Sequence, residues 1–275
     1  MPCVELGDVM RAATVGVIEA SDNAEWPVGR HVLGFGGLCD LYEGIPGVNV
    51  FYAAGECGGL PLTADLSLCS IIVGLTGWYG VNKVLEVTAD DVVVVSGAAG
   101  AVGSIVGQLA KLKGARVCGI AGGAAKCAWL KSLGFDETID YKAKGVSVAE
   151  AVKAFAPEGV SCYFDNVGGA VTDDVLLGMR NHARVAVCGS ISEYDDAWAG
   201  QRNWNLILMR RLKIQGFICT DQMAHLGTAK AELSALAAAG KLQYTEDIRE
   251  GLETYPATVR LLFSGENTGK LILKV

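Results

Sequence analysis

A valine run that ends in a glycine-rich turn constrains the fold more than any other part of the sequence. Residues 92–95 are four consecutive valines, and an unbroken β-branched run is typical of a strand buried on both faces of a parallel sheet. The next segment, residues 96–103, reads Ser-Gly-Ala-Ala-Gly-Ala-Val-Gly. This order predicts a buried strand, a tight turn and a helix, which together form one unit of an alternating α/β domain.

The turn resembles the fingerprint of dinucleotide-binding domains, with Ala98 in place of the first glycine. Gly100 would let the backbone approach a pyrophosphate, and Gly103 would let the helix pack close to the strand. Ala101 and Val102 would begin the helix, where free N–H groups and the helix dipole favour an anion. A glycine turn that serves only packing is the alternative, but the strand before it and the helix after it favour nucleotide binding.

The end of the second predicted strand distinguishes between the two nicotinamide coenzymes. Domains that bind NAD usually carry an acidic residue there, which accepts hydrogen bonds from the adenosine ribose. Residues 118–126 read Cys-Gly-Ile-Ala-Gly-Gly-Ala-Ala-Lys, with no acid. Lys126 could pair with a ribose 2′-phosphate, so the sequence predicts NADP(H). An ordinary solvated helix lysine is the alternative for this residue.

Strands and helices alternate through the second half of the chain, which predicts a doubly wound parallel sheet. Short β-prone runs in residues 1–65 predict a small, mostly antiparallel β unit, and residues 66–87 are expected to form the helix that links the two parts. The further expected strands span residues 116–120, 137–140, 161–165, 184–188, 213–219 and 270–274. The expected helices span residues 103–113, 125–133 and 229–240.

Charge and cysteine content narrow the class of protein. The formal net charge of −7 argues against nucleic-acid partners and anionic membrane surfaces, so small metabolites are the expected partners. The nine cysteines are scattered and only three histidines accompany them, which predicts no metal site and a reducing, cytoplasmic location. No signal peptide or membrane span is expected, because the longest apolar run is broken by Gly74 and Gly77.

An ordered set of motifs resembles the zinc-independent medium-chain dehydrogenase/reductases, in the branch of the alkenal double-bond and prostaglandin reductases. The resemblance runs from about residue 5 to the C-terminus, and the set is more specific than any of its members. The motifs lie at residues 7–11 (GDVMR), 75–79 (LTGWY), 96–104 (SGAAGAVGS), 121–127 (AGGAAKC), 139–142 (IDYK), 164–169 (FDNVGG), 187–192 (VCGSIS) and 265–270 (GENTGK).

The resemblance implies roles for individual residues in binding the coenzyme. Lys126 and Tyr141 would hold the 2′-phosphate, beside Gly122. Asn166 and Asn267 would contact the nicotinamide-side ribose and the pyrophosphate. The remaining implied contacts to the nicotinamide end come from Cys188, Ser190 and Ser192, which line the ring, and from Thr76 near its carboxamide.

The resemblance also implies a reaction. A hydride would pass from NADPH to the β-carbon of an enal or enone without a metal, and hydrogen-bond donors would stabilise the developing enolate. Tyr194 is the candidate donor; an exposed aromatic residue in an acidic loop is the alternative. The family also implies a homodimer. An NADPH-binding quinone reductase and a truncated, non-catalytic NADPH-binding protein remain alternatives, whereas a zinc alcohol dehydrogenase lacks support from clustered cysteines.

The resemblance finally implies a division into two domains. Residues 66–250 would form the NADP-binding Rossmann domain, and residues 1–65 would form a GroES-like β domain, on which residues 250–275 would pack back. That β domain is expected to be incomplete, because family members normally carry a further portion before the position of Gly7. Two local departures from the family are the pair Val73–Gly74 before Leu75, and Thr220 where many relatives have a tyrosine.

Overall fold

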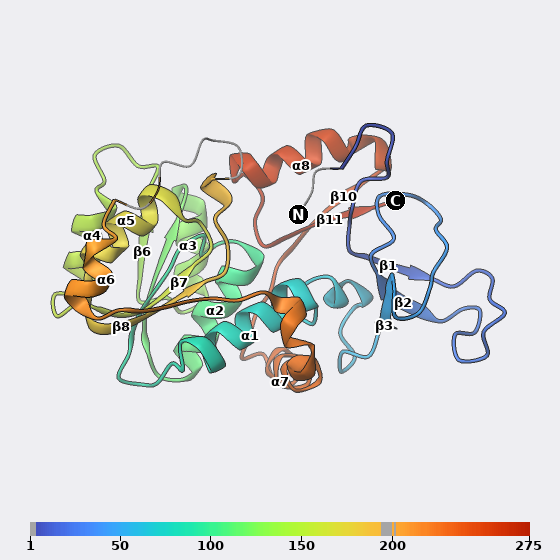
Figure 1. The fold of residues 1–275 in the computed structure, drawn as a ribbon, viewed down its shortest axis with the longest axis horizontal. Helices are drawn as coiled ribbons and strands as arrows, with labels where there is room; N and C mark the ends of the chain where they lie inside the picture. Colours follow the sequence, from blue (N-terminus) through green and yellow to red (C-terminus); the bar gives the residue numbers. More distant parts are fainter. Residues whose placement is uncertain (1–3, 194–199, 201) are drawn as a thin grey trace.

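A computed structural model describes residues 4–193, 200 and 202–275 (Figure 1). A large sheet flanked by helices lies at one end of the long axis, and a small three-stranded sheet lies at the other. Helix α8 (Tyr255–Ser264) and a two-stranded sheet lie between them. The chain therefore returns from the large sheet toward the small one at its C-terminal end.

The large sheet has six strands in the order β6-β5-β4-β7-β8-β9. All five pairings between neighbouring strands are parallel. Strand order reverses at β4, whose neighbours are β5 and β7, and ligands of such sheets bind beyond the carboxyl ends of the strands at this point. The expected Rossmann-type sheet is thus confirmed. The strands are β4 (Val92–Val95), β5 (Arg116–Ala121), β6 (Glu137–Asp140), β7 (Val160–Asp165), β8 (Met179–Val187) and β9 (Lys213–Gly216).

Each face of this sheet packs into its own hydrophobic core, because successive side chains of a strand point to opposite faces. Val93 and Val95 belong to the core that also holds helix α2 (Ala101–Leu112). Val94 belongs to the other core, which includes residues of helix α4 (Val148–Phe155). The valine run is buried on both faces, as the sequence predicts, since Val93, Val94 and Val95 have no exposed surface.

Most expected elements are present, with different ends. Strand β8 begins at Met179, five residues before the expected Arg184, and β9 ends at Gly216 rather than Cys219, where a 3₁₀ turn (Cys219–His225) begins. Helix α2 begins two residues earlier than expected, at Ala101. The other helices of this part are α3 (Ala124–Ser132), α5 (Gly169–Leu177), α6 (Asn205–Arg210) and α7 (Leu226–Ala238).

The linking helix is shorter than the expected span of residues 66–87. It runs as a π-helical turn (Ile71–Leu75), helix α1 (Thr76–Tyr79) and a second π-helical turn (Gly80–Val84). The side chain of Ser70 caps it by accepting a hydrogen bond from the N–H of Val73 at 2.9 Å. The preceding residues fold back on the helix, so a Cβ at Gly74 would lie 1.8 Å from the carbonyl oxygen of Leu68. Apolar spacing alone did not reveal this reversal.

The small sheet is antiparallel, with the order β1-β2-β3, as its β-prone runs predict. Its strands are β1 (Thr14–Val17), β2 (His31–Gly34) and β3 (Val50–Ala53). Strands β10 (Glu246–Glu250) and β11 (Lys270–Lys274) pair in parallel, which the sequence did not predict. A groove of about 1520 Å³ is lined by β1, α8 and β11. The proposed boundaries at residues 65 and 250 stay a prediction.

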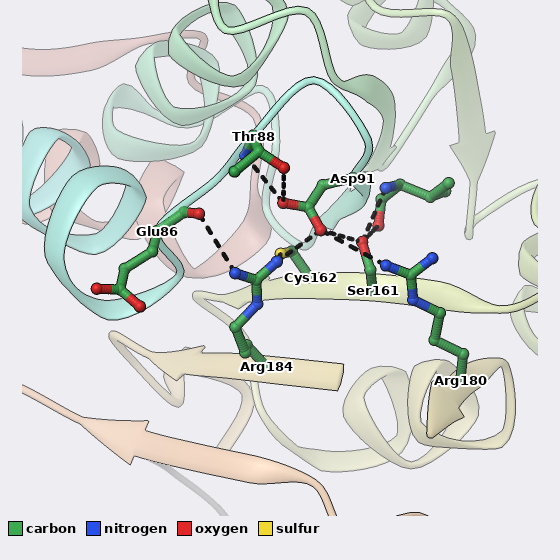
Figure 2. A network of polar contacts seen from close by, with 8 residues as sticks. Glu86, Thr88, Asp91, Ser161, Cys162, Arg180 and Arg184 are labelled. Atoms are coloured by element: carbon green, nitrogen blue, oxygen red, sulfur yellow. Dashed lines mark hydrogen bonds and ion pairs between the residues drawn. The ribbon is translucent and has the colours of Figure 1, made fainter. Parts of the chain in front are cut away.

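A polar network ties the amino ends of β4 and β7 to Arg184 of β8 (Figure 2). The carboxylate of Asp91 accepts hydrogen bonds from Ser161 Oγ at 2.7 Å and Arg184 Nη2 at 2.5 Å. It also accepts one from the N–H of Thr88 at 2.9 Å. Burial would raise the pKa of Asp91, but these hydrogen bonds outweigh it and hold the pKa below its usual range. The network lies opposite the carboxyl ends of the strands, so we assign it a structural role.

Within the ranges given above, the structure has no helix that combines the length and the apolar character needed to span a membrane.

Candidate coenzyme-binding site

The glycine turn after β4 forms the floor of the candidate site. The N–H of Ala98 donates to the carbonyl oxygen of Ile120 at 3.0 Å, and that of Gly100 donates to Gly97 at 3.0 Å. A Cβ at Gly103 would lie 2.4 Å from the carbonyl oxygen of Gly97 and 2.7 Å from Cα of Ala98. The helix can therefore approach the turn this closely only with glycine at position 103, as the fingerprint requires.

Helix α2 directs its amino end at the same point. Gly100 precedes the helix and provides no side chain to cap it. Ala101 and Val102 form its first turn, where N–H groups have no carbonyl partner one turn earlier in the helix. An anion near Gly100 would meet these N–H groups and the positive end of the helix dipole.

Asp165, at the carboxyl end of β7, organises the next turn of the site. Its Oδ1 accepts hydrogen bonds from Ser96 Oγ at 2.9 Å, Tyr163 Oη at 2.8 Å and the N–H of Val167 and Gly168, both at 3.0 Å. Its Oδ2 accepts one from Thr172 Oγ1 at 2.6 Å. The Asp165 side chain is 2% exposed. One buried carboxylate therefore joins the ends of β4 and β7 to the start of α5.

Asn166 is held beside the glycine turn by Ser96. The N–H of Asn166 donates to Ser96 Oγ at 3.0 Å, and its Nδ2 donates to the Ser96 carbonyl oxygen at 2.7 Å. This places Asn166 at the switch point between β4 and β7. Its implied contact with the coenzyme stays a prediction.

The segment after β8 contacts the turn that follows β7. The N–H of Cys188 donates to the carbonyl oxygen of Asp165 at 2.8 Å, and burial raises the pKa of its thiol to about 12. Ser192 Oγ donates to the carbonyl oxygen of Val167 at 2.7 Å. The Cβ of Ser190 lies 3.1 Å from the position that a Cβ at Gly168 would take. The structure thus brings Cys188, Ser190 and Ser192 against the turn that follows β7.

Two lysines lie at the carboxyl ends of β5 and β6. Lys126 Nζ donates to the carbonyl oxygens of Gly265 at 2.7 Å and Asn267 at 2.5 Å. Burial, and then the charge of Lys142, lower the pKa of Lys126. A Cβ at Gly122 would lie 2.9 Å from Cε of Lys142 and 3.0 Å from Cε1 of Tyr141. The structure therefore brings Gly122, Lys126 and Tyr141 together, and it adds Lys142 to them.

The C-terminal turn covers this part of the site. The N–H of Gly269 donates to the carbonyl oxygen of Ala99 at 3.1 Å, within a bridge between Gly100 and Gly269. Asn267 is buried in the turn, and its Nδ2 donates to the carbonyl oxygen of Gly269 at 3.2 Å. Residues far apart in sequence thus meet at the glycine turn, and Asn267 lies among them.

Two other candidate residues are less directly placed. Thr76 is buried in α1, where its Oγ1 donates to the carbonyl oxygen of Ile71 at 3.4 Å. Its implied position near the carboxamide stays a prediction. Tyr194, the candidate hydrogen-bond donor to the substrate, lies outside the described residues.

The sequence analysis did not single out Ser96, Lys142 or Asp165. Asp165 is the acidic end of a strand in which all six residues are buried, and a buried carboxylate requires several partners. That feature could have revealed it. Lys142 had no comparable signal in the sequence, because its hydrogen bond to the carbonyl oxygen of Ser264 joins residues that meet only in the folded chain.

Among the described residues, no three or more His, Cys, Asp or Glu side chains are grouped so that they could hold a metal ion.

Comparison with known sequences identifies the family. Residues 101–237 match the family described as zinc-binding dehydrogenase. Prostaglandin reductase 1 of Bos taurus is 39% identical over 274 residues, which cover 98% of this chain and 82% of that protein. The NADP⁺-dependent 2-alkenal reductase of Nicotiana tabacum is 40% identical over 205 residues, which cover 74% of this chain and 59% of that protein.

Comparison with solved structures gives the same result. The crystal structure of CurA from Vibrio vulnificus in complex with NADPH superposes with a TM-score of 0.89 at 36% identity, and the match covers 99% of this chain and 81% of that one. The sequence comparison and the structure comparison therefore agree. The chain belongs to the zinc-binding dehydrogenase family of medium-chain dehydrogenase/reductases, in the branch of the prostaglandin and alkenal reductases.

Proposed function

We propose that the protein is an NADPH-dependent reductase of the activated carbon–carbon double bond of α,β-unsaturated aldehydes and ketones. The observation that carries this proposal is the meeting, at the carboxyl ends of β4 and β7, of a glycine turn, an amino end of α2 without a capping side chain, and a lysine beside the second strand. Relatives of the chain include an NADP⁺-dependent 2-alkenal reductase and a protein solved with NADPH.

The residues at the carboxyl ends of these strands fit NADPH. Gly100 and the first turn of α2 would hold the pyrophosphate, since they offer N–H groups and no bulk. Lys126 would pair with the 2′-phosphate, and no acidic residue occupies positions 121–123 to repel it. Asn166 and Asn267 would contact the nicotinamide-side ribose and the pyrophosphate, and the segment from Cys188 to Ser192 would line the nicotinamide. When bound, the coenzyme would supply a hydride to the β-carbon of the substrate, and the α-carbon of the resulting enolate would then take up a proton.

The chain itself must stabilise negative charge at the substrate carbonyl oxygen. A hydrogen-bond donor placed at that oxygen lowers the barrier, because charge develops there in the transition state. We propose that Tyr194 donates this hydrogen bond from its phenolic Oη. No zinc takes part in this proposal, since a hydrogen-bond donor replaces the Lewis acid at the oxygen.

The proposal is tested by NADPH oxidation with a short 2-alkenal and, separately, with a simple quinone. We expect NADPH to be consumed with the 2-alkenal, and NADH to be consumed much more slowly because it lacks the 2′-phosphate. The product should carry the new hydrogen from NADPH on its β-carbon, which deuterium-labelled coenzyme would reveal. Turnover of the quinone alone would identify a quinone reductase instead. Binding of NADPH without turnover of either acceptor would identify a non-catalytic NADPH-binding protein.

We further propose that the protein works as a homodimer in the cytoplasm. Strand β9 is an edge of the large sheet, and the neighbouring helix α6 exposes Leu208 and Met209 to the extents of 78% and 64%. An exposed apolar patch beside a free strand edge suits association with a second copy. The eight cysteines among the described residues are free thiols, which suits a reducing compartment.

Sedimentation equilibrium is expected to give twice the chain mass of 28.7 kDa. Leu208→Glu should shift the equilibrium toward the monomer, because a charge at the patch opposes its burial. Lys153→Glu, an exposed change on α4, should leave the mass unchanged. A wild-type mass of one chain at all concentrations would exclude the dimer, and fractionation that finds the protein outside the cytosol would exclude the location.

A further inference from the structure

The ammonium groups of Lys126 and Lys142 are both bonded to the C-terminal turn. Lys126 Nζ donates to the carbonyl oxygens of Gly265 and Asn267, and Lys142 Nζ donates to that of Ser264 at 3.0 Å. Neither lysine takes part in the ion pairs found within the described part of the chain. Two cations therefore meet neutral carbonyl oxygens of one short turn.

This arrangement places two positive charges beside each other. Burial, and then the nearby charge of Lys142, lower the pKa of Lys126. Asp140 lies near them, since its Oδ1 accepts the N–H groups of Gly123 at 2.8 Å and Lys142 at 3.0 Å, but it forms no ion pair with either lysine among the described residues. Two like charges beside each other favour the binding of a multiply charged anion, because each cation then gains an opposite charge.

The stem of Lys142, an exposed residue, contacts its neighbours. Its Cδ and Cε pack over Gly122, where a Cβ would approach them to 3.0 and 2.9 Å. Its Nζ lies 5.9 Å from the centre of the Tyr141 ring, a separation at which a cation is attracted to the ring face. The side chain therefore lies across the tip of β5, beside the residue that the coenzyme proposal assigns to the 2′-phosphate.

We propose that Lys142 is a second specificity-determining residue for the phosphorylated coenzyme. In the free protein the two lysines donate to the carbonyl oxygens of Ser264, Gly265 and Asn267. When the coenzyme binds, phosphate oxygens replace these carbonyl oxygens as acceptors. This inference rests on the proposed binding of NADPH. Replacement of the carbonyl oxygens frees the turn at residues 264–267 from both lysines. The 2′-phosphate is thus coupled to the segment that carries Asn267, a residue that the coenzyme proposal assigns to the nicotinamide-side ribose and the pyrophosphate.

The dissociation constants of NADPH and NADH should be measured by titration calorimetry for the wild type and for Lys142→Ala, Lys142→Arg and Lys144→Ala. We expect Lys142→Ala to weaken NADPH binding about tenfold, as for a lost hydrogen bond to a charged group. NADH binding should change less than about twofold, since no 2′-phosphate is present. Lys142→Arg should retain the preference for NADPH. Lys144 is exposed in the same segment, so Lys144→Ala should leave both constants unchanged.

An equal effect of Lys142→Ala on the two coenzymes, or no effect on either, would overturn the role of Lys142. A wild type without preference for NADPH would instead contradict the proposed function. Amide hydrogen exchange tests the replacement of the carbonyl oxygens: residues 264–269 should exchange faster in the NADPH complex than in the NADH complex. Equal exchange in both complexes would show that the lysines keep their bonds to the turn.

Discussion

Lys126→Glu is expected to weaken NADPH binding by about a hundredfold to a thousandfold, the equivalent of about 3–4 kcal/mol. The change replaces an attraction to the 2′-phosphate by a repulsion, at a position where burial already lowers the pKa of the lysine. NADH should be affected far less, because it has no charge at that position. The measurement is a pair of dissociation constants obtained by coenzyme fluorescence under identical salt, since salt screens the exposed part of the interaction.

A matched change separates this effect from a general loss of positive charge. Lys153→Glu alters the net charge by the same amount but lies exposed on α4, so NADPH affinity should stay within about twofold of the wild type. Lys126→Glu also removes two hydrogen bonds to the C-terminal turn, and a thermal melt without coenzyme would report any loss of stability. Parallel weakening of NADH and NADPH would mean that Lys126 supports the turn and does not select the coenzyme.

The coenzyme site could be predicted from sequence where local chemistry determines it. The valine run, the glycine turn and the absence of an acid after β5 depend on neighbours in the chain, and the structure confirms the strand, turn and helix that they predict. Gly103 shows the reason most clearly, since any Cβ there would meet the backbone of Gly97. A fingerprint of this kind is a steric requirement that the sequence expresses directly.

The partners of Lys126 could not be predicted, because they lie about 140 residues further along the chain, at Gly265 and Asn267. Residues 246–250 and 270–274 form a parallel pair of strands. Two parallel strands need a long connection between them, and no local sequence pattern predicts which strands such a connection will pair. The shortened linking helix has a similar origin. Its apolar pattern begins at residue 66, but the Leu68 carbonyl oxygen packs against Gly74, so the helix starts only at Ile71.

Asp165→Ala is expected to lower the free energy of unfolding by about 3–5 kcal/mol. The substitution removes the acceptor of five hydrogen bonds, from three side chains and two backbone N–H groups. Donors that remain buried without a partner cost more than the lost bonds themselves. The backbone from Asn166 to Gly168 should lose its fixed position as well, so the folded fraction should also bind NADPH more weakly. Urea denaturation monitored by circular dichroism measures the stability, and calorimetry measures the binding.

Asp165→Asn distinguishes the hydrogen-bond network from the volume of the side chain. The amide oxygen of asparagine offers two lone pairs to the donors that Oδ1 now accepts, and its NH₂ group would face Thr172 Oγ1, a hydroxyl that can also accept. The expected loss is therefore smaller, about 1–2 kcal/mol. Asp90→Ala, an exposed change before β4, should stay within about 0.5 kcal/mol of the wild type. An equal loss of free energy of unfolding for Asp165→Ala and Asp165→Asn would contradict this role. It would mean that the backbone alone holds the turn after β7, and that the carboxylate does not help to form the candidate coenzyme site.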